Sequence, residues 1–341
     1  MTAGAPWLFA AAAWFVLAAP AWFILAAPAA WAASETAAAP TTVDGPRVVG
    51  EEEAQPEPGV DPMRFGKAPD AAFGAFQRGL YVTALNLALP RANEGDAAAQ
   101  TLVAEIYSRG LGIKRDEAEA ARWYQAAAEQ NVPEAQFQYA LLLLDGRFVE
   151  KDVDQAFALM EEAANAGNSM AQFNYAQMLV DRVPGPRGVE RAVPFYEKAA
   201  RAGIADAQYA MAQIHAAGVG GKPENATEAR RWLELAARRN FDTAQLELGT
   251  WMVQGVGGAR DEEAGFAWLK AAADSGNVAA QNRVAKLYRA GVGTEADPVV
   301  AAAWYILARR GGLVDTEMDG FLEGLTEEER RNAIAQANRL R

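Results

Sequence analysis

Apolar and polar residues alternate at helical spacing along most of this chain, in blocks that repeat. Each block begins with an alanine–glutamine step that opens an amphipathic stretch. The glutamines are Gln100, Gln136, Gln172, Gln208, Gln245 and Gln281, at intervals of 36 or 37 residues. A fixed period of about 20–50 residues is typical of a solenoid, in which each unit buries its apolar face only by stacking on its neighbours.

Within a block, the pattern predicts two helices joined by a glycine-rich turn. In the first block, residues 100–107 and 116–130 have apolar positions at helical spacing, and Gly110-Leu111-Gly112 lies between them. The fourth residue after each glutamine is small, which allows two helices to approach closely. These small residues are Ala104, Ala140, Ala176, Ala212, Gly249 and Ala285. The preceding position is expected to fill the space between layers and holds Val103, Tyr139, Tyr175, Met211, Leu248 and Val284.

The second predicted helix carries a bulky pair at a fixed place. The pairs are Trp123-Tyr124, Leu159-Met160, Phe195-Tyr196, Trp232-Leu233, Trp268-Leu269 and Trp304-Tyr305. Three residues before each pair stands a small residue: Ala120, Ala156, Ala192, Ala229, Gly265 or Ala301. Large and small residues at fixed offsets predict stacked helices whose side chains interdigitate.

Helix ends keep the same period. Glycine or asparagine ends a helix before each repeat, as expected for a left-handed C-cap: Gly95, Asn131, Gly167, Gly203, Asn240 and Gly276. Asp116, Asp261 and Asp297 are the predicted N-caps of second helices, and Pro298 suits a first helical position.

These residues resemble the Sel1-like repeat family, a branch of the tetratricopeptide superfamily. The family pattern is roughly Ala-Gln-x-x-Leu-Gly-x-x-Tyr-x-x-Gly-x-Gly followed by Ala-x-x-Trp-Tyr-x-x-Ala-Ala, and residues 99–128 and 280–308 match it nearly in full. A generic tetratricopeptide array has a period near 34 and a shorter turn. The resemblance covers six repeats over residues 96–311 and implies an all-α fold, a right-handed α-solenoid. Residues 183–188 depart from the Gly-x-Gly turn, so we expect an irregular third repeat.

The segments that flank the repeats read as caps. Residues 70–95 predict an N-terminal capping helix pair, and residues 312–341 predict C-terminal capping helices. Thr326 and Glu329 form a capping-box signal in the last helix. Residues 34–69 are rich in proline and glutamate, which predicts a disordered linker.

The beginning of the chain is apolar. Residues 7–33 hold no charged side chain, and Ala30-Trp31-Ala32 fits a cleavage site of small residues. This favours a cleaved signal peptide over residues 1–33, although no lysine or arginine precedes the apolar run. An uncleaved N-terminal membrane anchor is the alternative, because the run is long enough to span a bilayer. The first interpretation predicts a periplasmic or secreted protein, the second an inner-membrane anchored protein that faces the periplasm.

Net charge and composition limit the classes of binding partner and of chemistry. The formal net charge of −12 argues against nucleic acid or anionic lipid. The absence of cysteine removes disulfides, thiolate chemistry and cysteine-ligated metals.

No catalytic constellation emerges from the sequence. His215 is the only histidine and occupies a position that holds a packing residue in other repeats, and one histidine makes neither a triad nor a metal site. The Gly-Val-Gly motifs at Gly218, Gly255 and Gly291 follow predicted helices, not strands, so they indicate turns and not phosphate loops. We therefore expect no enzyme activity, no cofactor and no metal.

The resemblance places exposed positions on the first helices, which line the concave side of such stacks. The expected partner-binding groove comprises Phe137, Leu141, Leu144, Phe173, Gln177, Val180, Tyr209, Gln213, Leu246, Thr250 and Val253, with charged residues at both ends. An exposed apolar strip marks an interaction site and suits an amphipathic or extended peptide. The alternative is that these residues pack against one another inside a tightly wound superhelix.

The predicted function is a non-catalytic, extracytoplasmic scaffold that binds a peptide or helix of an envelope protein. The resemblance extends to periplasmic proteins that regulate sensor kinases and exopolysaccharide production, which is an analogy of fold. One alternative is a module that binds cell-wall glycan, or peptidoglycan, by stacking aromatic side chains on sugars. A hydrolase is the third class, for which the sequence supplies no nucleophile or base.

Overall fold

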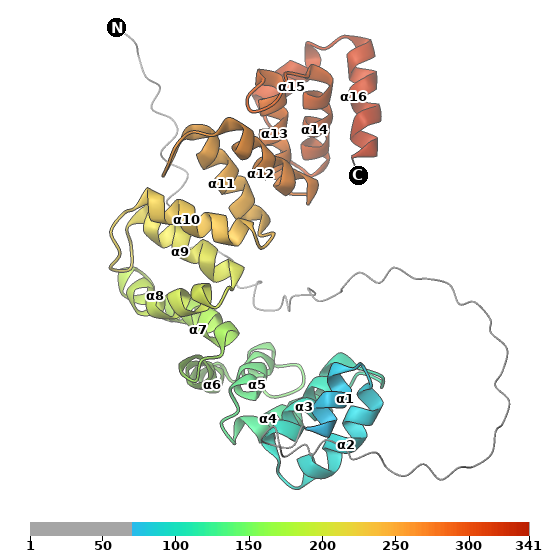
Figure 1. The fold of residues 1–341 in the computed structure, drawn as a ribbon, viewed down its shortest axis with the longest axis vertical. Coiled ribbons are helices and arrows are strands. Elements are labelled where there is room, and N and C mark those ends of the chain that lie inside the picture. The colour runs from blue at the N-terminus through green and yellow to red at the C-terminus, as the bar shows by residue number, and fades with distance from the viewer. Residues whose placement is uncertain (1–69, 341) are drawn as a thin grey trace, which may run out of the picture. The chain divides into compact units, whose positions relative to one another are not determined.

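The computed structural model describes residues 70–340 of the 341-residue chain, and this part folds into sixteen helices without a strand (Figure 1). The predicted signal peptide and linker lie outside the described residues. Within them, no helix combines the length and the apolar character needed to cross a membrane. The described chain divides into two compact units, residues 70–132 with 147–150 and residues 133–146 with 151–340.

Each unit is a succession of helical hairpins. The first unit contains α1 (Ala71–Gln77), α2 (Tyr81–Asn93), α3 (Ala97–Arg109) and α4 (Glu117–Ala128). The second contains α5 (Pro133–Asp145), α6 (Val153–Asn165), α7 (Ser169–Arg182), α8 (Pro186–Arg201), α9 (Ala205–Ala217), α10 (Ala226–Ala237), α11 (Asp242–Gln254), α12 (Glu262–Asp274), α13 (Val278–Ala290), α14 (Pro298–Arg310), α15 (Thr316–Glu323) and α16 (Glu327–Arg339). Inside each unit a helix contacts the helix before it and the helix after it, apart from α15 and α16, which both pack on α14. The prediction of an all-α solenoid of helix–turn–helix repeats is confirmed.

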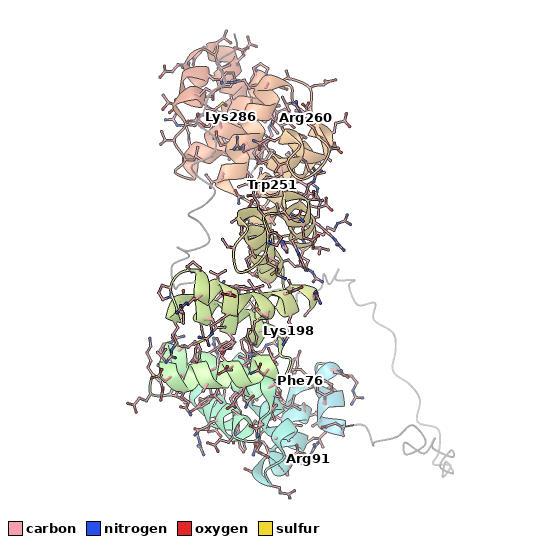
Figure 2. All side chains as sticks on the ribbon, turned by 90° about the vertical axis from the view of Figure 1, so that its left-hand side faces the viewer. Phe76, Arg91, Lys198, Trp251, Arg260 and Lys286 are labelled. Atoms are coloured by element: carbon pink, nitrogen blue, oxygen red, sulfur yellow. The ribbon has the colours of Figure 1, made fainter. Side chains whose placement is uncertain are left out.

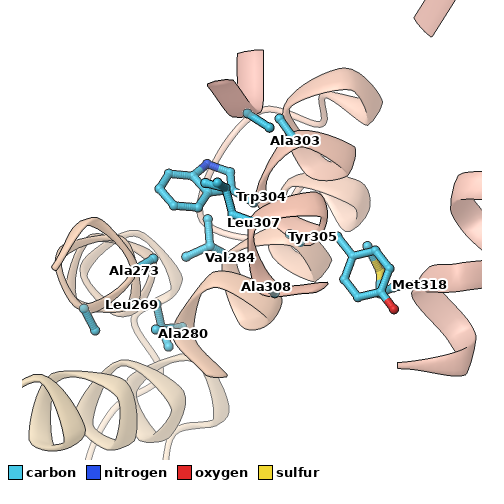
Figure 3. Packing of buried hydrophobic residues seen from close by; sticks show 13 residues of the cluster. Leu269, Ala273, Ala280, Val284, Ala303, Trp304, Tyr305, Leu307, Ala308 and Met318 are labelled. Carbon is cyan, nitrogen blue, oxygen red and sulfur yellow. The ribbon is translucent and has the colours of Figure 1, made fainter. Parts of the chain in front are cut away.

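The small and large positions have the predicted roles. The five alanines four residues after the repeated glutamines are at most 1 % exposed, and the larger residues before them are at most 6 % exposed. Close packing of this kind leaves little room for larger side chains at the small positions. In the cluster that joins α12 to the C-terminal helices, Trp304, Tyr305 and Met318 are buried together (Figure 3).

The repeated glutamine has a structural role that its spacing alone does not reveal. Five of the six are at most 6 % exposed, and Gln281 is half-buried. In five repeats the side-chain amide donates to the carbonyl oxygen of an alanine eight residues earlier, at 3.1–3.4 Å. That alanine lies near the end of the preceding repeat's second helix, where carbonyls lack a partner within the helix. Gln136 differs and donates to Glu162 Oε2 at 2.7 Å.

The predicted helix ends are confirmed. Asp116, Asp261 and Asp297 accept backbone N–H groups at 2.9–3.0 Å, and Thr326 with Glu329 forms the capping box. All six glycine or asparagine terminators have positive φ, from 60° to 99°. A left-handed backbone at these six places explains why other residue types do not occur there.

The third repeat is irregular, as its sequence predicts. Helix α7 ends at Arg182 and α8 begins at Pro186, so the turn between them is much shorter than a Gly-x-Gly turn. Gly188 lies so close to the carbonyl oxygen of Val183 that a side chain there would collide with it. Glycine at this position therefore permits the short turn.

Candidate interaction surface

The eleven residues of the predicted groove lie on the first helices of four repeats, α5, α7, α9 and α11, all in the second unit. Ten of them are half-buried. Phe137 is only 6 % exposed, so its ring is buried. The prediction that Phe137 is an exposed groove residue is wrong. The other ten are called the first-helix strip below.

Several side chains of the strip also pack internally. The Phe173 ring lies 6.0 Å from that of Tyr196 in α8, and the Tyr209 ring lies 5.3 Å from that of Phe241. Leu246 and Val253 pack against the buried cluster of α12 to α14. The strip is therefore part surface and part edge of the core.

Polar members of the strip connect neighbouring helices. Gln213 in α9 donates from Nε2 to Glu247 Oε2 in α11 at 2.7 Å, and the Thr250 hydroxyl donates to the Leu246 carbonyl at 2.8 Å. Gln177 in α7 has no hydrogen-bond partner for its side chain among residues 70–340. Among the polar side chains of the strip, Gln177 is thus the one that makes no hydrogen bond within residues 70–340.

Glu247 is the carboxylate beside this strip. It is half-buried, and desolvation raises its pKa even though Tyr209 and Gln213 hydrogen-bond to it. Burial also raises the pKa of the Tyr209 hydroxyl, as does the negative charge of Glu247. This group links α9 to α11, and the sequence analysis missed it because Glu247 falls at an offset outside the groove pattern.

The charged end of the strip at the sixth repeat is neutralised by the C-terminal cap. Lys286, labelled in Figure 2, lies 2.7 Å from Asp315 and 3.1 Å from Glu317, and Arg289 forms an ion pair with Glu317. The Lys286 ammonium and the Asn282 amide outweigh desolvation and lower the pKa of Asp315 to about 2. The predicted charged residues are present at this end, and Lys286 and Arg289 are both ion-paired with the C-terminal cap.

His215 does not assemble a catalytic site with described residues. It is half-buried in α9, and its buried Nδ1 has no hydrogen-bond partner within residues 70–340. A triad requires a carboxylate or equivalent group to orient the imidazole through that nitrogen. The same part of the chain contains no group of three or more histidine, aspartate or glutamate side chains placed to hold a metal ion.

Comparison with known proteins identifies the repeats. Six consecutive segments match the family model described as the Sel1 repeat, over residues 97–132, 133–168, 169–204, 205–241, 243–277 and 278–313. The chain is similar in fold to a Sel1 repeat protein from Oxalobacter formigenes, with 24 % identity, a TM-score of 0.60 and coverage of 70 % of this chain and 94 % of that chain. It is also similar to c5321, a protective antigen of uropathogenic Escherichia coli with an SLR fold, with 25 % identity, a TM-score of 0.53 and coverage of 76 % and 64 %. A comparison with curated proteins gave no match.

Proposed function

Since the chain belongs to the Sel1 repeat family, we propose that it is a non-catalytic scaffold that holds a peptide or helix of an envelope protein on its first-helix strip. Sel1 repeats generally mediate protein–protein interactions, and proteins built from them are generally non-catalytic. A non-catalytic role is supported by the surroundings of His215, which lack an orienting partner for Nδ1 within the described residues.

The observation that carries this proposal is the polar and apolar mixture around Gln177. Its amide is unpartnered within residues 70–340 and half-buried, between Phe173 and Val180 on the same helix face. Because the Gln177 amide makes no hydrogen bond to residues 70–340, a ligand that supplies a backbone carbonyl or N–H group can bond to it in place of water. An extended peptide or a helix end offers such groups beside apolar side chains.

Glycan binding is supported less well. Stacking on a sugar needs an open ring face, whereas Phe137 is buried and Phe173 and Tyr209 pack against other aromatic rings. The scaffold is therefore proposed ahead of the glycan-binding module.

The proposed location is the periplasm or the exterior of the cell. Its support is the apolar run of residues 7–33 and the small residues around Ala32. An uncleaved membrane anchor remains the alternative. Cell fractionation combined with N-terminal mass determination of the mature protein distinguishes the two, and recovery of the intact chain from the cytoplasm would contradict both.

Site-specific crosslinking in intact cells tests the scaffold. A photocrosslinking amino acid at Gln177 or Val180 is expected to capture a discrete envelope protein. The matched control is Ala267, which is exposed on the second helix α12. Identical products from Gln177 and Ala267 would show that capture does not involve the strip. Capture of peptidoglycan fragments at Gln177 would favour the glycan-binding alternative.

A further inference from the structure

In most repeats, the turn between the two helices packs on the second helix of the preceding hairpin. The second glycine of four Gly-x-Gly turns lies against the N-terminal part of that helix: Gly112 against Val82 in α2, Gly220 against Val189 and Val193 in α8, Gly257 against Ala226 in α10 and Gly293 against Glu262 in α12. The turn of the second repeat, residues 147–150, likewise groups with the helices of the first unit. Glycine is needed because the backbone of the turn approaches its neighbour closely.

The third repeat lacks this cover. Its turn from Arg182 to Pro186 is too short to extend over α6, which is the second helix of the preceding repeat. Val153, the first residue of α6, is 48 % exposed. A hollow of about 580 Å³ lies beside it, lined by Asp154, Phe157, Leu179, Arg182, Val183 and Arg191. This hollow is called the α6 notch.

The α6 notch combines an apolar floor with a cationic wall. Leu179 is 2 % exposed, and the Phe157 ring packs 5.1 Å from that of Tyr175. The Arg182 guanidinium lies 4.5 Å over the Phe157 ring and 2.7 Å from Asp154. Arg191 is exposed and has no ion-pair partner among residues 70–340.

Two guanidinium groups therefore face one carboxylate. In a chain of net charge −12, the lining of this notch has two arginines and one aspartate, beside the half-buried side chains of Phe157 and Val183. Arginine binds carboxylates with paired, charge-assisted hydrogen bonds. The notch is thus suited to an anionic ligand that also buries an apolar side chain.

We propose that the α6 notch binds a turn of a partner protein that contains glycine, an aliphatic side chain and a neighbouring carboxylate. The chain's own turns supply the template, because equivalent spaces over α8, α10 and α12 are filled by Gly-Val-Gly segments around Val219, Val256 and Val292. The carboxylate of the ligand pairs with Arg191. This site lies at the turns between helices, so it is separate from the first-helix strip and does not depend on it.

A synthetic peptide with the sequence of residues 291–297, Gly-Val-Gly-Thr-Glu-Ala-Asp, is a direct probe. Fluorescence anisotropy of the labelled peptide measures its dissociation constant with the full chain. This constant is expected to rise about tenfold or more in Arg191→Glu, because a charge-assisted contact is replaced by repulsion. The matched control is Lys198→Glu, which is exposed on the same helix but lies outside the notch and about two turns from Arg191; it should bind as the wild type does. A peptide with glutamine and asparagine in place of its two acids should bind the wild type more weakly than the acidic peptide does, and should lose little further affinity in Arg191→Glu.

Equal binding by wild type and Arg191→Glu, equal weakening by Lys198→Glu, or no binding to the wild type would overturn the proposal. Self-association of the chain that disappears in Arg191→Glu would also overturn it, in favour of a second copy as the occupant. Thermal unfolding of Arg191→Glu controls for folding, and if that variant is unfolded, Arg191→Gln takes its place in the same comparison.

Discussion

Gly249 in α11 and Gly265 in α12 face each other so closely that a Cβ atom on either would lie 2.7 Å from the carbonyl oxygen of the other. The corresponding pair is alanine–alanine in the other five hairpins, from Ala104 and Ala120 to Ala285 and Ala301. The fifth repeat therefore uses two glycines for the same contact. At this crossing the two helix backbones contact each other directly, whereas in the other repeats the methyl groups of two alanines lie between them.

Gly249→Ala is expected to destabilise the protein despite the better helix propensity of alanine. Alanine gains about 1 kcal/mol in a helix, whereas overpacking against the Gly265 carbonyl and Leu269 costs roughly 1–3 kcal/mol. Urea unfolding should show a net loss of about 1 kcal/mol. Gly320→Ala in α15 is the control, because nothing lies within 4 Å of its added methyl group, and it should be neutral or stabilising. Equal stability of the two variants would mean that the α11–α12 crossing is looser than described.

Phe137→Ser is expected to lower the free energy of unfolding, and any loss of partner binding should follow from that loss of stability. The ring is 6 % exposed, and removal of a buried phenylalanine costs about 3–5 kcal/mol. Gln177→Ala changes a half-buried side chain without a partner in the described region, so its cost should stay within about 0.5 kcal/mol. Thermal unfolding and partner capture are measured on both variants. A loss of stability assigns the residue to the core, and a loss of capture alone assigns it to the binding surface. A Phe137→Ser variant that unfolds like the wild type would restore Phe137 to the groove.

Asp315→Asn tests the ion cluster of Lys286, Asp315 and Glu317. The pKa of Asp315 is depressed to about 2 from 3.8, so its carboxylate stabilises the folded state above about pH 4 and loses that effect as pH falls toward 2. Screening at the surface limits the contribution to about 1 kcal/mol. Asparagine keeps an oxygen as the N-cap acceptor of α15, but its NH2 group replaces the Oδ2 atom that accepts from Asn282 and pairs with Lys286. The loss of charge is therefore the part of the effect that depends on pH.

The free energy of unfolding of Asp315→Asn should be lower than that of the wild type at pH 7 and should converge with it near pH 2. Glu328→Gln, an exposed change in α16, controls for net charge. A deficit that is independent of pH would assign the effect to packing and remove the electrostatic explanation.

Periodicity predicted the hairpins, the helix ends and the buried small residues, because each of these depends on contacts that every repeat shares. It failed where a residue's surroundings differ between repeats. Phe137 and Phe173 share one offset, yet Phe137 is buried and Phe173 is half-buried. The ion pairs of Lys286 and Arg289 were not predicted, because their partners, Asp315 and Glu317, come from a cap that is outside the repeat.

The α6 notch illustrates the same limit. The sequence marked residues 183–188 as irregular, but the consequence of the short turn appears on α6, a helix of the preceding repeat. The short turn of the third repeat therefore changes the exposure of α6 and not that of the turn itself. Only the packing of turn on helix in the other repeats reveals what the third repeat lacks.

Glu247→Gln should change stability with a pH dependence opposite to that of Asp315→Asn. Burial raises the pKa of Glu247 in the folded state, so the wild type is most stable relative to the variant when the carboxyl is protonated, below its ordinary pKa of 4.5, and loses that advantage as pH rises through the folded pKa. At pH 7 the neutral amide avoids the cost of a desolvated charge and keeps an oxygen acceptor for Tyr209 or Gln213. The variant should therefore be the more stable protein at pH 7, and the difference should vanish in acid.

Glu263→Gln, exposed on α12, should leave the dependence of stability on pH unchanged. Urea unfolding of the three proteins between pH 3 and pH 8 measures the effect. If Glu247→Gln instead loses stability relative to the wild type as the pH rises from 3 to 7, the hydrogen bonds from Tyr209 and Gln213 more than offset the cost of burying the charge.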